Sequence, residues 1–188
     1  VKPDVVVDLG DFDDMRSLNS YDSRYPLSVV SQSYESDILT GQDARDRLWH
    51  KFRHMKRRKP YRVGIMGNHE YRITKAVAEN PRIEGKNYGI SLKHLQTDHW
   101  YDEYHEYVNE APALVDIDGI TYSHFIASGS LGRAVYNKHL GSALLERLSC
   151  SVTVGHNHEW HHYSKLDARP YPIHGCSVGC YKGKEETW

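Results

Sequence analysis

Side chains that bind divalent metals recur in four polar segments of this sequence. The segments are residues 10–14 (GDFDD), residues 67–70 (GNHE), His124 and residues 155–158 (GHNH). Carboxylate, amide and imidazole groups all bind divalent ions, and a ligand set without cysteine suits Mn, Fe, Zn or Ni. The residue types therefore indicate a metal centre, and affinity alone does not choose among these ions.

The spacing of these segments places them at the ends of predicted strands. Apolar runs or hairpin patterns precede them at residues 3–10, 61–66, 113–123 and 151–154. Open α/β sheets form their binding sites beyond the carboxyl ends of the strands. Glycine begins three of the four segments and lets the backbone turn sharply, so we expect the following side chains to share one cleft.

Each segment also has an ordinary structural explanation. Asp11 and Asp14 fit a turn closed by Asx hydrogen bonds, and Asn68 fits the N-cap of a helix. A single His124 is more often a core or hairpin residue. His156 and His158 are harder to explain in this way, because residues i and i+2 of a strand face the same side and can bind one ion.

Taken in order, the segments resemble the signature of the calcineurin-like metallophosphoesterases. That family's pattern is D-x-H, G-D-x-x-D, G-N-H-D/E, a single His and G-H-x-H, and the chain matches the last four blocks. Residues 175–177 (GCS) are similar to the N-P-G-S stretch that often follows. The resemblance implies one α/β (α+β) domain over residues 1–188, folded as a four-layer α/β/β/α sandwich with mixed sheets. It also implies hydrolysis of phosphomonoesters or phosphodiesters.

The resemblance further implies which residues bind two divalent ions. Asp11 bridges both ions, since a carboxylate has two oxygens that can each contact one ion. Asn68, His124 and His156 bind the second ion, and His158 binds the first. Manganese is the preferred metal, with iron, zinc and nickel as the other candidates.

Catalytic roles follow from the same resemblance. His69 faces the phosphate and the leaving-group oxygen, so that Asn68 and His69 together contact the substrate. Glu70 holds the imidazole ring of His69 in its orientation, and Asp14 orients the neighbouring loops. A hydroxide held between the ions is expected to attack phosphorus in line, while the ions and His69 stabilise the developing charge.

The sequence departs from the family pattern in two places. No D-x-H block precedes residues 10–14, so the chain is expected to lack the family's first strand and a short piece of its C-terminal end. Without that block the first ion loses two ligands, which makes an inactive metal-binding scaffold one alternative. His124 is followed by Phe125, where the family usually has glycine. The alternative ligands are His99, His105 and His139.

A basic segment raises a second alternative, a nuclease-like phosphodiesterase of the DNA-repair exonuclease type. Residues 51–62 contain Lys51, Arg53, Lys56, Arg57, Arg58, Lys59 and Arg62. These charges suit phosphate contacts to nucleic acid if they share one face. They equally suit the solvated C-terminal end of a helix, where positive charge complements the helix dipole. The overall net charge of −1 favours the helix end.

Composition indicates the cellular setting. A chain of 188 residues with 39% hydrophobic content suits a compact domain with a substantial core. No run approaches the roughly 20 apolar residues that span a bilayer, and the first residues lack the apolar core of a signal peptide. Three cysteines without a C-x-x-C pair indicate a reducing environment. We therefore expect a cytoplasmic protein without a membrane partner.

Two sequence patterns predict the elements of the first half. Strands at residues 3–10 and 61–66 alternate with helices at residues 36–58 and 70–80, which predicts a parallel sheet. The first helix is predicted to bury a stripe formed by Leu48, Phe52 and Met55. Residues 87–110 show no pattern that assigns them.

The second half is predicted to switch to antiparallel pairing. Asp118-Gly119 predicts a hairpin between strands at residues 113–117 and 120–123. A helix is expected at residues 131–148, with Leu140, Leu144, Leu145 and Leu148 on one stripe. The remaining strands are expected at residues 151–154, 159–164 and 171–178.

Overall fold

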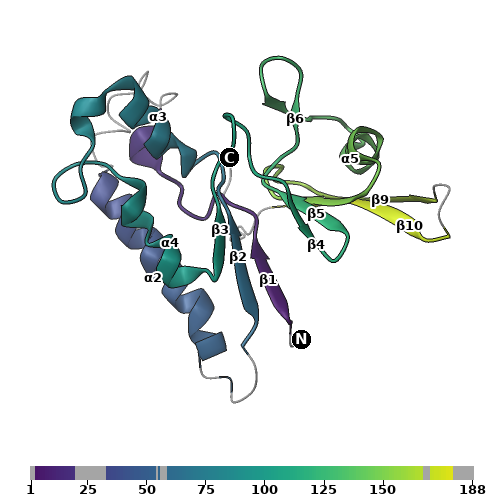
Figure 1. Cartoon of the computed structure of the whole chain (residues 1–188), viewed down its shortest axis with the longest axis horizontal. Helices are drawn as coiled ribbons and strands as arrows, with labels where there is room; N and C mark the ends of the chain where they lie inside the picture. The colour runs from purple at the N-terminus through teal and green to yellow at the C-terminus, as the bar shows by residue number, and fades with distance from the viewer. Residues whose placement is uncertain (1–2, 20–32, 54, 56–58, 167–169, 180–188) are drawn as a thin grey trace. The chain divides into compact units, whose positions relative to one another are not determined.

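The computed structural model describes residues 3–19, 33–53, 55, 59–166 and 170–179. The chain divides into two compact units, Val1–His105 (unit 1) and Glu106–Trp188 (unit 2). Each unit has its own sheet and hydrophobic core, and Figure 1 labels the elements. A single domain over residues 1–188 stays a prediction.

A parallel sheet forms the centre of unit 1. Its strands are β1 (Val5–Asp8), β2 (Tyr61–Ile65) and β3 (Glu103–His105), in that order. Both neighbouring pairs are parallel, which confirms the arrangement predicted from the alternation of strands and helices. Because β1 and β2 are adjacent and parallel, the loops that follow them leave from the same edge of the sheet.

Helix α2 (Tyr34–Arg53) packs on this sheet through aromatic residues. Trp49 and Phe52 on α2 cluster with Val6 on β1 and with Tyr104 on β3. Figure 1 shows α2 lying alongside the three strands. The C-terminal half of the helix therefore packs on this sheet.

The buried stripe of α2 differs from the predicted one. Leu48 is 40% exposed, whereas its neighbour Trp49 is 2% exposed, so the prediction that Leu48 is buried is wrong. Phe52, from the same predicted stripe, does pack against the aromatic cluster. Among the α2 positions whose side chains the structure describes, Ile38, Gly41 and Arg45 are also buried. Hydropathy favoured Leu48 in the sequence. Arg45 and Gly41 are buried instead, because the carboxylate of Asp13 packs beside them.

Short helices surround the loops of unit 1. They are η1 (Arg16–Leu18), α3 (Tyr71–Glu79), η3 (Pro81–Ile83), η4 (Leu92–Leu95) and α4 (Thr97–Trp100). Helix α3 ends before Pro81, as predicted. The last two helices and β3 occupy the segment that the sequence left unassigned. Met15, Ile73 and Leu95 join Ile38 of α2 in a second core beneath the loops.

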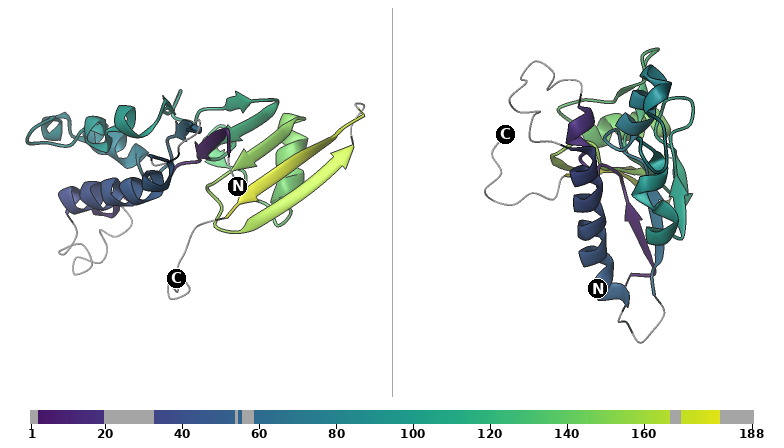
Figure 2. Two further views of the ribbon diagram at one scale, coloured as in Figure 1. Left: turned by 90° about the horizontal axis from the view of Figure 1, so that it is seen from below. Right: turned by 90° about the vertical axis from the view of Figure 1, so that its left-hand side faces the viewer.

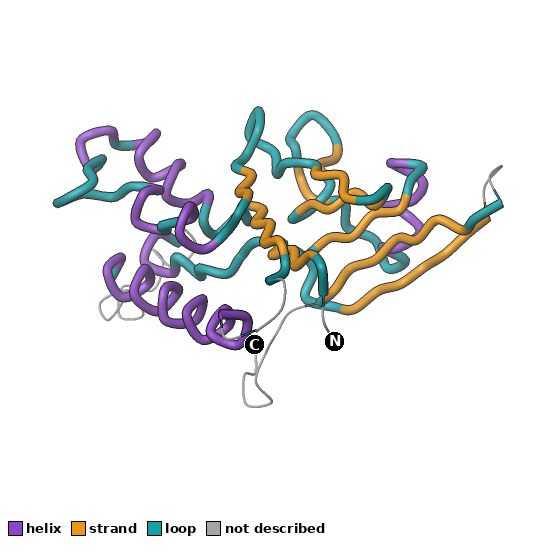
Figure 3. The backbone as a smooth tube through the Cα atoms, turned by 60° about the horizontal axis from the view of Figure 1, so that its bottom comes forward, coloured by secondary structure: helices purple, strands orange, loops and turns teal. Residues whose placement is uncertain are grey.

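Unit 2 contains a mixed sheet. Its order is β4 (Val115–Ile117), β5 (Ile120–Ser123), β8 (Ser151–Val154), β10 (Pro172–Val178) and β9 (Trp160–Leu166). The β4–β5 hairpin turns at Asp118 and Gly119, with φ of 51° and 80°, as the Asp-Gly pair predicted. Antiparallel pairing holds at both edges of the sheet, while β5–β8 and β8–β10 are parallel. Figure 3 shows β9 and β10 as the long strands of this sheet.

Helix α5 (Leu140–Leu148) covers one face of the sheet in unit 2. Leu140, Leu144 and Leu145 are buried against Val152, Val154 and Ile173, which confirms the predicted stripe. Figure 2 shows α5 beside the sheet. The helix was predicted to begin nine residues earlier, and this was wrong. Before α5, β6 (Ala127–Ser128) pairs instead with β7 (Arg133–Ala134).

The described residues thus form a mixed α and β fold with separate sheets in the two units. Among these residues, no helix is both long and apolar enough to cross a bilayer.

Candidate functional site

Two loops of unit 1 meet at the edge of the parallel sheet. Residues 10–14 follow β1, and residues 67–70 follow β2. Gly10 has a φ of 88°, and a methyl group there would overlap the backbone of Gly67. A methyl group on Gly67 would in turn overlap Asp11. The glycines of the two sequence motifs therefore allow the loops to touch.

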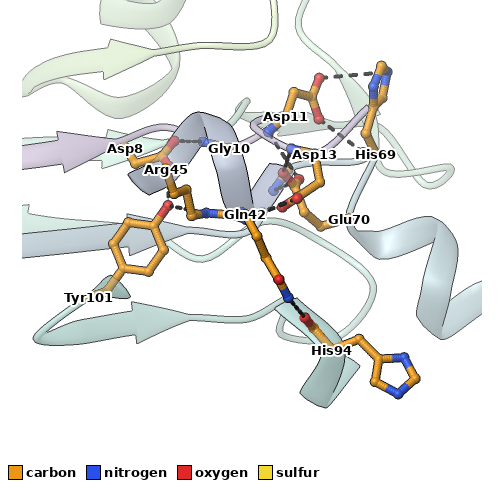
Figure 4. A network of polar contacts seen from close by, with 11 residues as sticks. Asp8, Gly10, Asp11, Asp13, Gln42, Arg45, His69, Glu70, His94 and Tyr101 are labelled. Atoms are coloured by element: carbon orange, nitrogen blue, oxygen red, sulfur yellow. Dashed lines mark hydrogen bonds and ion pairs between the residues drawn. The ribbon is translucent and has the colours of Figure 1, made fainter. Parts of the chain in front are cut away.

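The buried carboxylate of Glu70 joins these loops, as Figure 4 shows. Its Oε2 accepts hydrogen bonds from the backbone N–H groups of Asp11 and Gly67, both at 3.0 Å. Its Oε1 accepts one from the backbone N–H of Asp13 at 2.8 Å. Burial, followed by the nearby carboxylates of Asp11 and Asp13, raises the pKa of Glu70 to about 7. Glu70 thus fixes the shape of the loop that carries Asp11.

His69 lies between two carboxylates. Its Nδ1 is 3.0 Å from Asp14 Oδ1, and its Nε2 is 3.8 Å from Asp11 Oδ2. The backbone N–H of His69 also donates to Asp11 Oδ1 at 2.9 Å. The hydrogen bond with His69 lowers the pKa of Asp14. The sequence assigned orientation of the ring to Glu70, and the structure corrects this, because Asp14 contacts the ring while Glu70 binds backbone.

A buried ion pair behind the loop was not predicted. Arg45 on α2 binds Asp13 through both of its terminal nitrogens, with Nη1 at 2.9 Å from Oδ1, and both side chains are 1% exposed. The guanidinium also lies 4.7 Å from the ring centroid of Phe12. Burial raises the pKa of Asp13, and the bond to Arg45 opposes that shift. Arg45 shares the buried helical stripe with Trp49, which is the sequence signal that could have revealed it.

The same network reaches the end of β1. Arg45 Nε donates to Tyr101 Oη at 3.2 Å, and Tyr101 in turn donates to the carboxylate of Asp8. Asp8 accepts a hydrogen bond from the backbone N–H of Gly10 at 3.0 Å. Burial, followed by the charge of Asp8, raises the pKa of Tyr101, which keeps its hydroxyl protonated as a donor. Residues 8–13 are therefore held at both ends (Figure 4).

Two histidines of unit 2 each follow one of two neighbouring parallel strands. His124 follows β5 and His156 follows β8, and the backbone N–H of His156 donates to the carbonyl of His124 at 2.9 Å. His124 Nε2 lies 3.1 Å from His156 Nδ1, and His124 is fully buried. Phe125 packs against both rings, with centroid separations of 5.7 and 5.2 Å. Within unit 2 the structure thus brings two predicted ligands together.

The other predicted ligands lie on the adjoining loops. Asn68 is part-buried between Gly67 and His69, and His158 is exposed in the turn after β8. Ser177 on β10 supports that turn, because its Oγ donates to the carbonyl of Glu159 at 3.0 Å. Of the alternative ligands, His139 precedes α5 in unit 2, whereas His99 and His105 belong to unit 1.

The basic segment is only partly described. Arg53 pairs with Asp46, and Arg62 binds Asp102 with Nη2 at 2.9 Å from Oδ1. Lys59 is exposed. The side chain of Lys51 and the residues Lys56, Arg57 and Arg58 lie outside the described residues. The two described arginines are therefore engaged by carboxylates within unit 1.

Unit 1 presents carboxylates and an imidazole at one sheet edge, and unit 2 presents two imidazoles in contact. Carboxylate and imidazole groups in such arrangements can bind divalent cations and move protons. Comparisons of the chain with protein-family models, with curated proteins and with solved structures found no match.

Proposed function

We propose that this protein is a metallophosphoesterase of the calcineurin-like type, which hydrolyses phosphate esters with two divalent ions. The proposal includes the four-layer sandwich that the family resemblance implies. One observation carries it: the GDFDD and GNHE motifs meet, and His69 binds Asp11 although 58 residues separate them. The parallel pairing of β1 with β2 brings the two loops to one edge, and the contact between them is made through Asp11, the proposed bridging ligand.

The proposed ligands for the ions are Asp11, Asn68, His124, His156 and His158. The imidazole pair of unit 2 fits a shared ion, because nitrogens bound to one ion at about 2.0–2.1 Å lie roughly 2.9 to 3.4 Å apart. The 3.1 Å between His124 and His156 falls in this range. When bound, such ions neutralise charge on a phosphate and supply a hydroxide nucleophile at neutral pH.

His69 is the proposed catalytic group of the chain itself. Asp14 accepts a hydrogen bond from Nδ1 of the ring, which fixes the tautomer and leaves Nε2 for the substrate. In its protonated form the ring can donate a proton from Nε2 to a leaving-group oxygen. The side chain is 24% exposed, so a phosphate ester can reach it. Asp14 therefore acts by positioning His69.

Contacts within unit 1 fix the position of Asp11, the proposed bridging ligand. Its backbone N–H is bound by Glu70, and its Oδ1 accepts from the backbone of His69. Its φ of 59° lies in the left-handed region, which is unusual outside glycine and is common at functional sites. The contacts from Glu70 and His69 therefore hold the Asp11 carboxylate beside the loop that follows β2.

Turnover by the purified full-length protein tests this proposal. Metal-stripped protein should hydrolyse p-nitrophenyl phosphate or bis(p-nitrophenyl) phosphate only after addition of Mn²⁺, and the ratio of the two rates separates monoesterase from diesterase. Asp11→Asn and His156→Ala should each lower turnover by at least about 10²-fold. His161→Ala is the matched control, because this histidine lies on β9, pairs with Glu159 and is not a proposed ligand. Turnover that survives Asp11→Asn or a chelator would contradict the proposal.

The same assay separates the alternatives. An inactive scaffold would bind Mn²⁺ without turnover of either ester. A nucleic-acid-directed enzyme would cleave DNA or RNA far better than the small diester, with a strong dependence on salt. The engagement of Arg53 and Arg62 by carboxylates gives that alternative no support from the described residues.

A further inference from the structure

Arg72 lies on the first turn of α3, three residues after His69. Its Nη1 donates to the backbone carbonyls of Asp14 at 2.7 Å and of Met15 at 3.3 Å. The side chain is only 18% exposed. Since Asp14 and Arg72 are 58 residues apart in the chain, this contact holds the loop after β1 against α3.

The end of that loop has an unusual backbone conformation. Met15 has a φ of 44°, in the left-handed region that residues other than glycine seldom adopt. Its side chain is fully buried in a core that includes Ile73 and Leu95. The Met15 carbonyl accepts hydrogen bonds from Arg72 and from the backbone N–H of Leu18, the latter at 3.1 Å. Two donors therefore hold this part of the loop in place.

Glu70 and Arg72 bind opposite kinds of backbone group in the same loop. Glu70 accepts hydrogen bonds from the backbone N–H groups of Asp11 and Asp13. Arg72 donates to the two carbonyls at the far end of the loop. Buried backbone needs partners for both its donors and its acceptors. The first turn of α3 therefore fixes residues 11–15 from both ends.

Asp14 lies between Arg72 and His69. Its Oδ1 is 3.0 Å from His69 Nδ1 and 3.9 Å from Arg72 Nη1. The Asp14 side chain is 69% exposed, so packing alone does not fix its direction. The bond from Arg72 holds the Asp14 backbone, and the charge of the guanidinium attracts the carboxylate towards α3. Arg72 thus directs the residue that contacts the His69 ring.

We propose that Arg72 is a positioning residue for His69 and acts through Asp14. Each terminal nitrogen of a guanidinium carries two N–H groups, which suits a bond to two neighbouring carbonyls. With Asp14 held in this way, its carboxylate accepts from Nδ1 of the ring and leaves Nε2 for a substrate. The placement of the ring concerns unit 1 alone, whereas its consequence for catalysis rests on the proposed phosphoesterase function.

The tautomer of the His69 ring tests this inference. Long-range ¹H–¹⁵N NMR of the metal-free full-length protein, at about pH 9 where imidazole rings are neutral, reports which nitrogen carries the proton. The wild type should carry it on Nδ1, and Arg72→Met should lose this preference, as should Asp14→Asn. Arg72→Lys should keep it, because an ammonium can still donate to both carbonyls. The matched control is Lys75→Met, at an exposed position of the same helix, which should keep it too.

Turnover then separates positioning from substrate binding. With an unactivated ester, Arg72→Met should lower kcat by roughly tenfold or more and leave KM nearly unchanged. The double variant with Asp14→Asn should be no slower than the slower single variant, because both changes act on one ring. A rise in KM with an unchanged kcat would overturn the positioning role.

The NMR comparison does not need turnover, so this inference and the phosphoesterase proposal can fail separately. A wild-type tautomer retained in Arg72→Met would overturn the inference, as would a wild-type ring that carries its proton on Nε2. An equal change in Lys75→Met would also overturn it. Circular dichroism checks that each variant is folded, and Arg72→Gln, with its shorter side chain, replaces Arg72→Met if that variant does not fold.

Discussion

The guanidinium of Arg45 binds the carboxylate of Asp13 inside unit 1, where both side chains are 1% exposed. Asp13 is also held through its backbone, because its N–H donates to Glu70 at 2.8 Å. Asp11 lies two residues earlier in the same loop. The position of the proposed bridging ligand therefore depends on a helix that carries no ligand itself.

Removal of one partner of this pair should destabilise the protein strongly. Arg45→Met or Asp13→Asn leaves a buried group unpaired, at an expected cost of about 3–5 kcal/mol in the free energy of unfolding. The double variant should lose clearly less than the sum of the two, as measured by urea unfolding. Arg47→Met is the matched control, since Arg47 forms an exposed pair with Asp43 on the same helix and should change stability little. Additive losses would contradict the coupling.

Gly41 on α2 should not tolerate alanine. Alanine in a helix is normally more stable than glycine by about 1 kcal/mol. At this position, however, a methyl group would overlap the carboxylate of Asp13. Gly41→Ala should therefore lower the Tm, whereas Thr40→Ala, at the exposed neighbouring position, should leave it unchanged or raise it slightly. A higher Tm for Gly41→Ala would show that the loop can move away from the helix.

The prediction of α2 from sequence shows what periodicity can establish. Its existence followed from apolar spacing, but the stripe was placed on Leu48 instead of Trp49. The true stripe includes Gly41 and Arg45, which hydropathy counts as poor core residues. They are buried because Asp13, from a distant loop, is buried beside them. Such a pair cannot be read from either segment alone.

The bond between Arg62 and Asp102 should make stability depend on pH. Hydrogen bonds from Arg62 lower the pKa of Asp102, so the folded state favours the ionised carboxylate. That contribution is present above the ordinary Asp pKa of about 3.9 and is lost as the pH falls through the lower folded value. Asp102→Asn should thus cost less than about 1 kcal/mol at pH 7, because the pair is partly exposed. Urea unfolding between pH 7 and pH 3 should show the difference shrinking, and a constant difference would exclude this origin.

The sequence predicted that Asp11 lies near His69 but assigned the wrong partner to the His69 ring. Glycine-flanked polar motifs after strands correctly placed Asp11 beside His69, because parallel strands bring their following loops to one edge. The partner of the His69 ring was misassigned, because both Asp14 and Glu70 belong to the two motifs that meet. Only the structure shows which carboxylate contacts the ring. Tyr101 was missed because it follows α4, in the segment that had no recognisable pattern.

His69 should be catalytic without binding metal. His69→Ala should leave metal content near that of the wild type and lower turnover of an unactivated ester by roughly 10²-fold. A smaller loss is expected with p-nitrophenyl esters, whose leaving group needs little protonation. Asp14→Asn should also lower turnover, since it replaces the carboxylate that holds Nδ1 of the His69 ring. Loss of metal in His69→Ala would instead make this residue a ligand.

The number of Mn²⁺ ions bound by the full-length protein, measured by native mass spectrometry, tests whether Asp11 serves a two-metal centre. The wild type should bind two ions, and Asp11→Asn should lose occupancy at both positions, because its carboxylate is the proposed bridge. Asp98→Asn, which alters an exposed carboxylate on α4, should still bind two. A wild type that binds no Mn²⁺, or an Asp11→Asn variant that keeps both ions, would contradict the proposed centre.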